Sequence, residues 1–129
     1  MAFFLLAAAR AGVQAQQQQH PIDAEIDQCK ASKASLLGQI ECELNGYQKW
    51  SAEMERLYNL LLERLRGDAE LIMKEEQLAW VALRDVRFEF YDKFYGDQNS
   101  QFLTLIASSK TDFVRRRAKE LQLRLNEIR

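Results

Sequence analysis

The stretch LLGQIECELNGYQKWSAEMERLYNLLLERL, residues 36–65, decides the fold. Its apolar side chains return every three or four residues, which places them along one face of an α-helix. That face consists of Leu36, Ile40, Leu44, Tyr47, Trp50, Met54, Leu57, Leu61 and Leu65. We therefore predict one long amphipathic helix that begins after a capping Ser35 and ends at Gly67. The pair Asn45-Gly46 inside it is a point at which the helix could kink.

Three further helices are predicted around this one. Pro21 suits the first position of a short helix that runs to Ser32. A third helix spans Asp68–Tyr95, with a main inward apolar stripe widened by Met73, Trp80 and Tyr91; the main stripe consists of Ile72, Ala79, Leu83, Val86, Phe90 and Phe94. A fourth runs from Ser100 to the chain end, with inward residues Phe102, Ile106, Phe113, Val114, Leu121, Leu125 and Ile128. The predicted fold class is all-α: an antiparallel bundle of three long helices plus a short N-terminal helix.

The N-terminal sequence MAFFLLAAARAGVQA, residues 1–15, has the features of an export signal. A short apolar run is followed by small residues that end in Val13-Gln14-Ala15. No basic residue precedes the run and Arg10 follows it, so we expect a signal peptide with a truncated start; the alternative is an ordinary apolar helix turn. Residues 16–21 are expected to be a flexible mature N-terminus with an inert His20, and residues 22–129 a single domain. The expected location is periplasmic or secreted.

The chain has two cysteines, Cys29 and Cys42. An even number of cysteines in an exported chain favours a disulfide, since the compartment is oxidising. The bridge would close a loop of about 14 residues, worth roughly 3 kcal/mol in a chain-entropy estimate. It would hold the short first helix against the start of the second.

The charge distribution is uneven although the net charge of the 129 residues is only −1. Residues 22–78 carry 12 acids and 7 bases, whereas residues 79–129 carry 7 acids and 10 bases. Either packed helices complement each other across this difference, or one charged patch faces a partner. The basic run Arg115–Lys119 points in several directions around its helix, so we predict no binding to nucleic acid.

No pattern of catalytic residues emerges from the sequence. The sequence has no Gly-rich loop that could bind phosphate, and His20 is not close in sequence to either cysteine. The pair Glu75-Glu76 is expected to lie on the solvated helix surface and not to act as an acid/base pair. We predict a protein that is not an enzyme, with no catalytic, cofactor-binding or metal-ligating residues and no membrane insertion.

One polar group interrupts the apolar pattern of the third helix. Gln77, Trp80, Arg84 and Phe88 step at three, four and four residues, beside the main stripe. Half-buried polar groups need partners, so we expect Arg84 to reach a carboxylate on another helix. The alternative is a groove in which Trp80 and Arg84 anchor a bound partner.

The chain resembles the LprI-like family of small exported bacterial proteins, named for a member that inhibits lysozyme. The resemblance covers about residues 25–125 and rests on Cys29, Ser35, Cys42, Leu57-Tyr58, Gln77-x-x-Trp80-x-x-x-Arg84-Asp85 and Arg117-x-x-Glu120-Leu121. It implies a helical periplasmic or extracellular protein, with Tyr58, Gln77, Trp80, Arg84, Asp85, Arg117 and Glu120 as family-motif residues of structural or binding role.

Two departures from the family pattern are visible. Many relatives have a second cysteine pair, where this chain has Phe88 and about Ser109. No cysteine follows the apolar N-terminal run, so the sequence does not support a lipid anchor.

Two hypotheses about function follow. In the first, the protein binds an extracellular protein such as lysozyme, and the acidic residues 22–78 face that cationic enzyme. In the second, it is a structural or scaffold protein of the cell envelope that has no enzyme target and associates with itself. The sequence leaves the target and the oligomeric state open.

Overall fold

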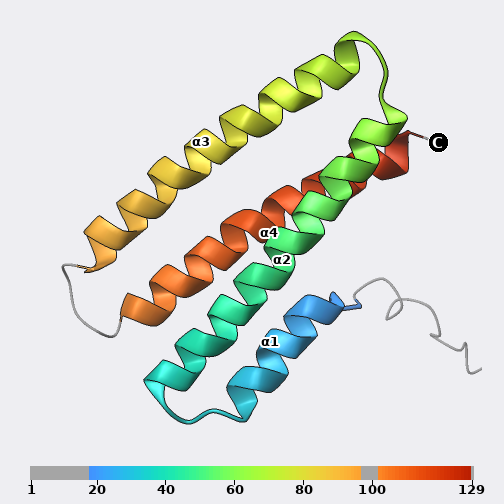
Figure 1. The fold of residues 1–129 in the computed structure, drawn as a ribbon. Coiled ribbons are helices and arrows are strands. Elements are labelled where there is room, and N and C mark those ends of the chain that lie inside the picture. The colour runs from blue at the N-terminus through green and yellow to red at the C-terminus, as the bar shows by residue number, and fades with distance from the viewer. Residues whose placement is uncertain (1–17, 97–101, 129) are drawn as a thin grey trace, which may run out of the picture.

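The computed structural model describes residues 18–96 and 102–128, which form four helices and no strand. The helices are α1 (Pro21–Ala31), α2 (Leu36–Arg64), α3 (Asp68–Gly96) and α4 (Leu103–Glu127). In Figure 1 the three long helices run antiparallel to their neighbours in the chain, and α1 lies along the first half of α2. The predicted all-α bundle is confirmed. The expected signal peptide, residues 1–15, lies outside the described residues.

The helix ends follow from local chemistry. The side chain of Ser35 accepts a hydrogen bond from the amide of Gly38, as expected for an N-cap. Helix α2 ends at Arg64, three residues before its predicted end, and Gly67 then adopts a positive φ of 63°. That backbone conformation suits glycine because it has no Cβ atom.

His20 differs from its expected role as an inert tail residue. It is the N-cap of α1, and its Nδ1 atom accepts a hydrogen bond of 3.1 Å from the amide of Ile22. Pro21 follows as the first helical residue, as predicted. The chain thus enters α1 through a cap at His20, and the flexible segment expected over residues 16–21 stays a prediction.

The hydrophobic core lies mainly between α2 and α4, which form the most extensive contact in the bundle. Its fully buried side chains include Trp50 and Leu61 from α2, together with Val114 and Leu121 from α4. The predicted inward face of α4 is confirmed at Ile106, Val114, Leu121 and Leu125, while Phe102, Phe113 and Ile128 are half-buried.

Helix α1 packs against α2 at a glycine. A Cβ atom added to Gly46 would lie 2.3 Å from Cδ1 of Ile26, so the bare backbone of α2 makes room for that buried side chain. Gly46 therefore serves close helix packing and not a kink, since α2 continues as one helix through it.

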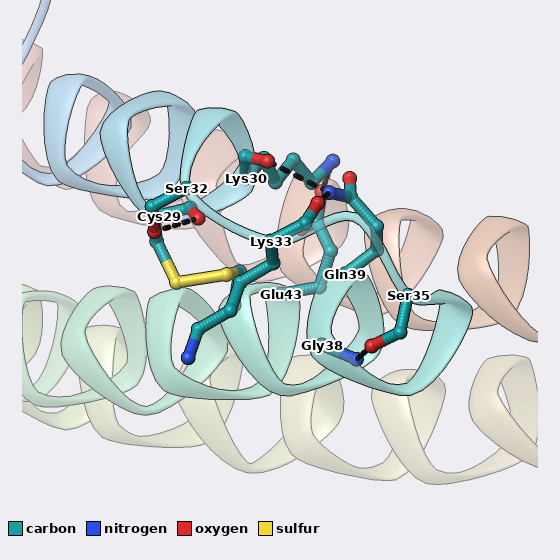
Figure 2. The surroundings of a disulfide bond; sticks show 9 residues. Cys29, Lys30, Ser32, Lys33, Ser35, Gly38, Gln39 and Glu43 are labelled. Carbon is teal, nitrogen blue, oxygen red and sulfur yellow. Dashed lines mark hydrogen bonds and ion pairs between the residues drawn. A yellow bond between two sulfur atoms is a disulfide. The ribbon is translucent and has the colours of Figure 1, made fainter.

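The predicted disulfide Cys29–Cys42 is present and joins α1 to α2, with a Cα–Cα distance of 5.6 Å. Figure 2 shows the turn beside it. The Gln39 side chain donates hydrogen bonds to the carbonyl oxygens of Lys30 and Lys33, at 2.8 and 2.5 Å. The buried carboxylate of Glu43 forms an ion pair with Lys30. Covalent and polar contacts thus fix the same corner of the molecule.

Helix α3 presents a different face to the bundle from the one that its apolar stripe predicts. Between 48% and 66% of the surface is exposed at each of Ile72, Leu83, Val86, Phe90 and Phe94. The side turned to α4 carries Met73, Gln77, Trp80, Arg84 and Phe88, all buried or half-buried. The prediction of an inward stripe is wrong because α3 has two faces with apolar residues, and the mixed polar and aromatic one is packed.

Candidate functional site

A buried arginine lies at the centre of the contact between α3 and α4. The Arg117 side chain is only 3% exposed, and its Nε and Nη2 atoms donate hydrogen bonds of 3.1 and 2.9 Å to Oε1 of Gln77. The amide nitrogen of Gln77 in turn contacts the sulfur of Met54, at 3.2 Å. Because each buried polar group has a partner, the guanidinium is held in one orientation across three helices.

Glu76 joins this arginine to a second one. Its carboxylate accepts hydrogen bonds from Nη1 of Arg117 at 2.6 Å and from Nη1 of Arg124 at 2.8 Å. Glu120 contacts the same two arginines from α4, at 3.2 and 2.8 Å. Burial alone would raise the pKa of Glu76, but the hydrogen bonds from Arg124 and Arg117 outweigh it and lower that pKa below its ordinary value. We call Glu76, Gln77, Arg117, Glu120 and Arg124 the arginine network.

The lowered pKa of Glu76 makes a prediction about acid stability. A carboxyl group with a lowered pKa in the folded state stabilises the fold above its unfolded pKa of about 4.3, and this contribution disappears as the pH falls through the folded value. We expect Glu76→Gln to flatten the loss of stability from about pH 5 downward. Urea unfolding of wild type and variant between about pH 3 and pH 7 measures the difference. Glu75→Gln, at the exposed neighbouring position, is the control and should keep the wild-type pH profile.

Trp80 lies beside the arginine network and packs among rings and cations. It stacks on Phe113 of α4 with ring centroids 5.5 Å apart. The guanidinium groups of Arg84 and Arg117 lie 5.7 and 5.8 Å from its ring centre, within the range of cation–π attraction. Trp80 is thus a half-buried packing residue of the α3–α4 contact.

Within the described residues, Arg84 reaches no carboxylate on another helix. Its ion pair is with Asp85, the next residue of α3, at 3.0 Å. The Arg84 side chain lies on the side of α3 turned to α4, at the edge of that contact, and 27% of it remains exposed. The prediction of an interhelical pair is wrong for Arg84, because Arg117 occupies the interhelical position.

A second polar group surrounds the fully buried Trp50. Its indole nitrogen donates a hydrogen bond of 3.0 Å to Oδ1 of Asp23, and the same oxygen accepts one of 2.9 Å from Arg115. The His20 ring lies 4.3 Å from the Trp50 ring, and Lys119 lies 5.9 Å from it. This group ties α1 to α2 and α4.

A comparison with known proteins identifies the family of this chain. The model of the family described as lysozyme inhibitor LprI matches residues 14–121, which is most of the chain. The chain belongs to the LprI family. The chain is also similar in fold to the crystal structure of an uncharacterized protein from Burkholderia thailandensis, which is 27% identical and superposes with a TM-score of 0.80. That match covers 86% of this chain and 56% of the other, so this chain spans little more than half the length of that protein. No curated protein matches the chain significantly.

The motif residues of this LprI-family chain fall into three places. Gln77, Arg117 and Glu120 meet in the arginine network, and Trp80 lies beside it. Arg84 and Asp85 pair with each other at its edge. Tyr58 packs partly buried against the hydrophobic core.

Sequence reasoning missed two members of the arginine network. Glu76 was expected to be solvated surface, whereas it binds two arginines with 41% of its side chain exposed. Arg124 was not singled out. Its spacing of seven residues from Arg117, two turns of one helix face, is the signal that could have found it.

The described part of this LprI-family chain has neither a cluster of metal ligands nor a membrane-spanning helix. Within residues 18–96 and 102–128 no group of three or more His, Cys, Asp or Glu side chains is placed to hold a metal ion. Over the same residues, no helix is both long enough and apolar enough to cross a bilayer. The arginine side chains of the network already have carboxylate or amide partners, so they hold helices together.

Proposed function

We propose that the chain is an exported module of the lysozyme-inhibitor type, which acts by binding a protein and not by catalysis. The match to the LprI family carries this proposal, since the family is described as a lysozyme inhibitor. The disulfide supports export, because such bonds persist mainly in oxidising compartments. The proposed location is periplasmic or secreted, with residues 1–15 as the signal peptide. The family match begins at residue 14, close to that boundary.

We propose that the outward face of α2 is the surface that contacts lysozyme. Glu41, Glu55 and Glu63 lie opposite the side of α2 that packs in the core, and all three are exposed. Among the described residues, no cation pairs with their side chains. The other acids of α1 and α2 have partners, as Glu25 has Lys49 and Glu53 has Arg56. Three acids of residues 22–78 that have no cation partner in the described part of the chain thus lie on one face of α2.

Such a face would attract a cationic enzyme mainly during approach. Charges at the rim of an interface raise the association rate more than they slow dissociation. Salt screens them, because the Debye length falls from about 10 Å at 0.1 M to about 3 Å at 1 M ionic strength. Inhibition should therefore weaken as salt rises.

The test replaces the three acids together by glutamine. Glu41→Gln/Glu55→Gln/Glu63→Gln should weaken inhibition of a cationic lysozyme on cell-wall substrate, on the order of tenfold at low salt. The matched control is Glu70→Gln/Glu89→Gln/Glu127→Gln, which removes the same charge from α3 and α4 and should leave inhibition unchanged. Far-UV circular dichroism checks that both variants stay helical.

The results separate function from mechanism. No inhibition by wild-type protein at any ionic strength would reject lysozyme as the target. Inhibition that both triple variants retain at all salt concentrations would reject the acidic face and keep the function.

A structural or scaffold protein of the cell envelope is the second candidate. The exposed apolar side of α3 favours it, since a self-associating protein needs such a surface. A wild-type protein that fails to inhibit lysozyme but self-associates would support this alternative.

A further inference from the structure

The outward side of α3 is a long apolar strip on the surface of the molecule. Ile72, Leu83, Val86 and Phe90 are 61%, 48%, 66% and 53% exposed, and Figure 1 shows α3 at the edge of the bundle remote from α1. If each fully exposed residue offers about 200 Å², these four leave roughly 450 Å² of largely apolar surface in water. A patch of this size is within the range of the largest apolar patch on a typical monomer, and such patches are often functional.

The spacing along this side is that of a seam between two helices. Ala79, Leu83, Val86 and Phe90 are separated by four, three and four residues. Apolar residues at alternating steps of three and four form the contact line of a two-helix coiled coil. We call these four residues the α3 seam.

The α3 seam complements a reversed copy of itself. With a twofold axis between positions 84 and 85, Leu83 of one copy faces Val86 of the other. In the next layers the small Ala79 faces the large Phe90. A parallel pairing would instead set Phe90 against Phe90 and leave a gap between the two alanines. Side-chain size thus favours the antiparallel arrangement.

We propose that the α3 seam is a self-association surface, which pairs antiparallel with the α3 seam of a second copy. Leu83, Val86 and Phe90 of two copies would together bury roughly 670 Å², which is the size of a weak, reversible interface. This inference is independent of lysozyme binding, because it uses α3 and leaves the outward face of α2 free.

A charge at the centre of the seam tests the proposal. Sedimentation equilibrium of the purified, disulfide-bonded protein from about 1 to 100 µM should show wild type shifting from monomer to dimer. Val86→Glu should stay monomeric over this range. Val86 is 66% exposed, so the variant should keep its helicity and melting temperature. Leu123→Glu, at a 63% exposed position of α4, is the matched control and should dimerise like wild type.

The antiparallel register has a test of its own. A mixture of Ala79→Cys and Phe90→Cys proteins should form a disulfide-linked heterodimer under mild oxidation, while neither protein alone should link to itself. In the proposed pairing, like positions are 11 residues apart along the helix, or about 16 Å, and a disulfide requires Cα atoms within about 7 Å.

Each remaining outcome would overturn the proposal. A wild type that is monomeric at the highest concentration rejects the dimer. If that monomer loses lysozyme inhibition on Val86→Glu, the seam contacts the enzyme and not a second copy. A dimer that Val86→Glu leaves intact uses another face, and self-linkage by Phe90→Cys alone indicates parallel pairing.

Discussion

Replacing Arg117 with alanine should lower the free energy of unfolding by about 3 kcal/mol. The buried Oε1 atom of Gln77 would lose both of its hydrogen bonds from the guanidinium, and an unsatisfied buried acceptor costs about 1–3 kcal/mol. The packed side chain beneath Trp80 would also disappear. Urea denaturation followed by far-UV circular dichroism measures the change.

Arg116→Ala is the control for this result. The neighbouring arginine is 79% exposed, and its one ion pair among the described residues is with Asp112 on its own helix, so its removal should change stability by less than about 0.5 kcal/mol. Arg117→Lys should recover little, because a lysine cannot donate two parallel hydrogen bonds to one amide oxygen. Equal small effects of Arg116→Ala and Arg117→Ala would show that the arginine network does not hold α3 against α4.

Removing the disulfide should also cost about 3 kcal/mol, which corresponds to a fall in melting temperature on the order of 10 °C. Cys29→Ala/Cys42→Ala frees a loop of about 14 residues in the unfolded state and leaves α1 attached through noncovalent contacts alone. Those contacts include Ile26 on Gly46 and the ion pair between Lys30 and Glu43. Thermal unfolding in oxidised and reduced buffer measures the effect.

The double variant supplies its own control. Reductant should lower the melting temperature of wild type to that of Cys29→Ala/Cys42→Ala and should leave the variant unchanged. A loss well below 1 kcal/mol would show that the noncovalent contacts of α1 suffice to hold it on α2.

The helices could be predicted because each carries a repeating pattern with clear ends. The stripe on α2 from Tyr47 to Leu61 is partly or fully buried as its period indicates, and Ser35 caps the helix that it precedes. Pro21 likewise begins α1. The disulfide followed from cysteine number and the expected compartment. The helices and their caps depend on residues close together in sequence. The disulfide could be predicted because the chain has only two cysteines that could pair.

The packed side of α3 could not be predicted in the same way. Periodicity finds an apolar stripe but does not say which of two stripes on one helix meets the bundle. The choice depends on Arg117, 40 residues after Gln77 in the sequence, whose guanidinium needs an acceptor on the facing helix. Gly46 was ambiguous for the same reason, since its role depends on Ile26 of another helix. Long-range partners decided both positions.

The surroundings of the two tryptophans give the protein a separate optical probe for each peripheral helix. Trp50 is 1% exposed beneath His20 and Asp23, so its fluorescence should report whether α1 is docked. Trp80 lies between Phe113 and Arg84, so its emission should report the docking of α3. Single-tryptophan forms made with Trp50→Phe and Trp80→Phe could therefore resolve whether α1 and α3 detach from the α2–α4 pair together or in sequence.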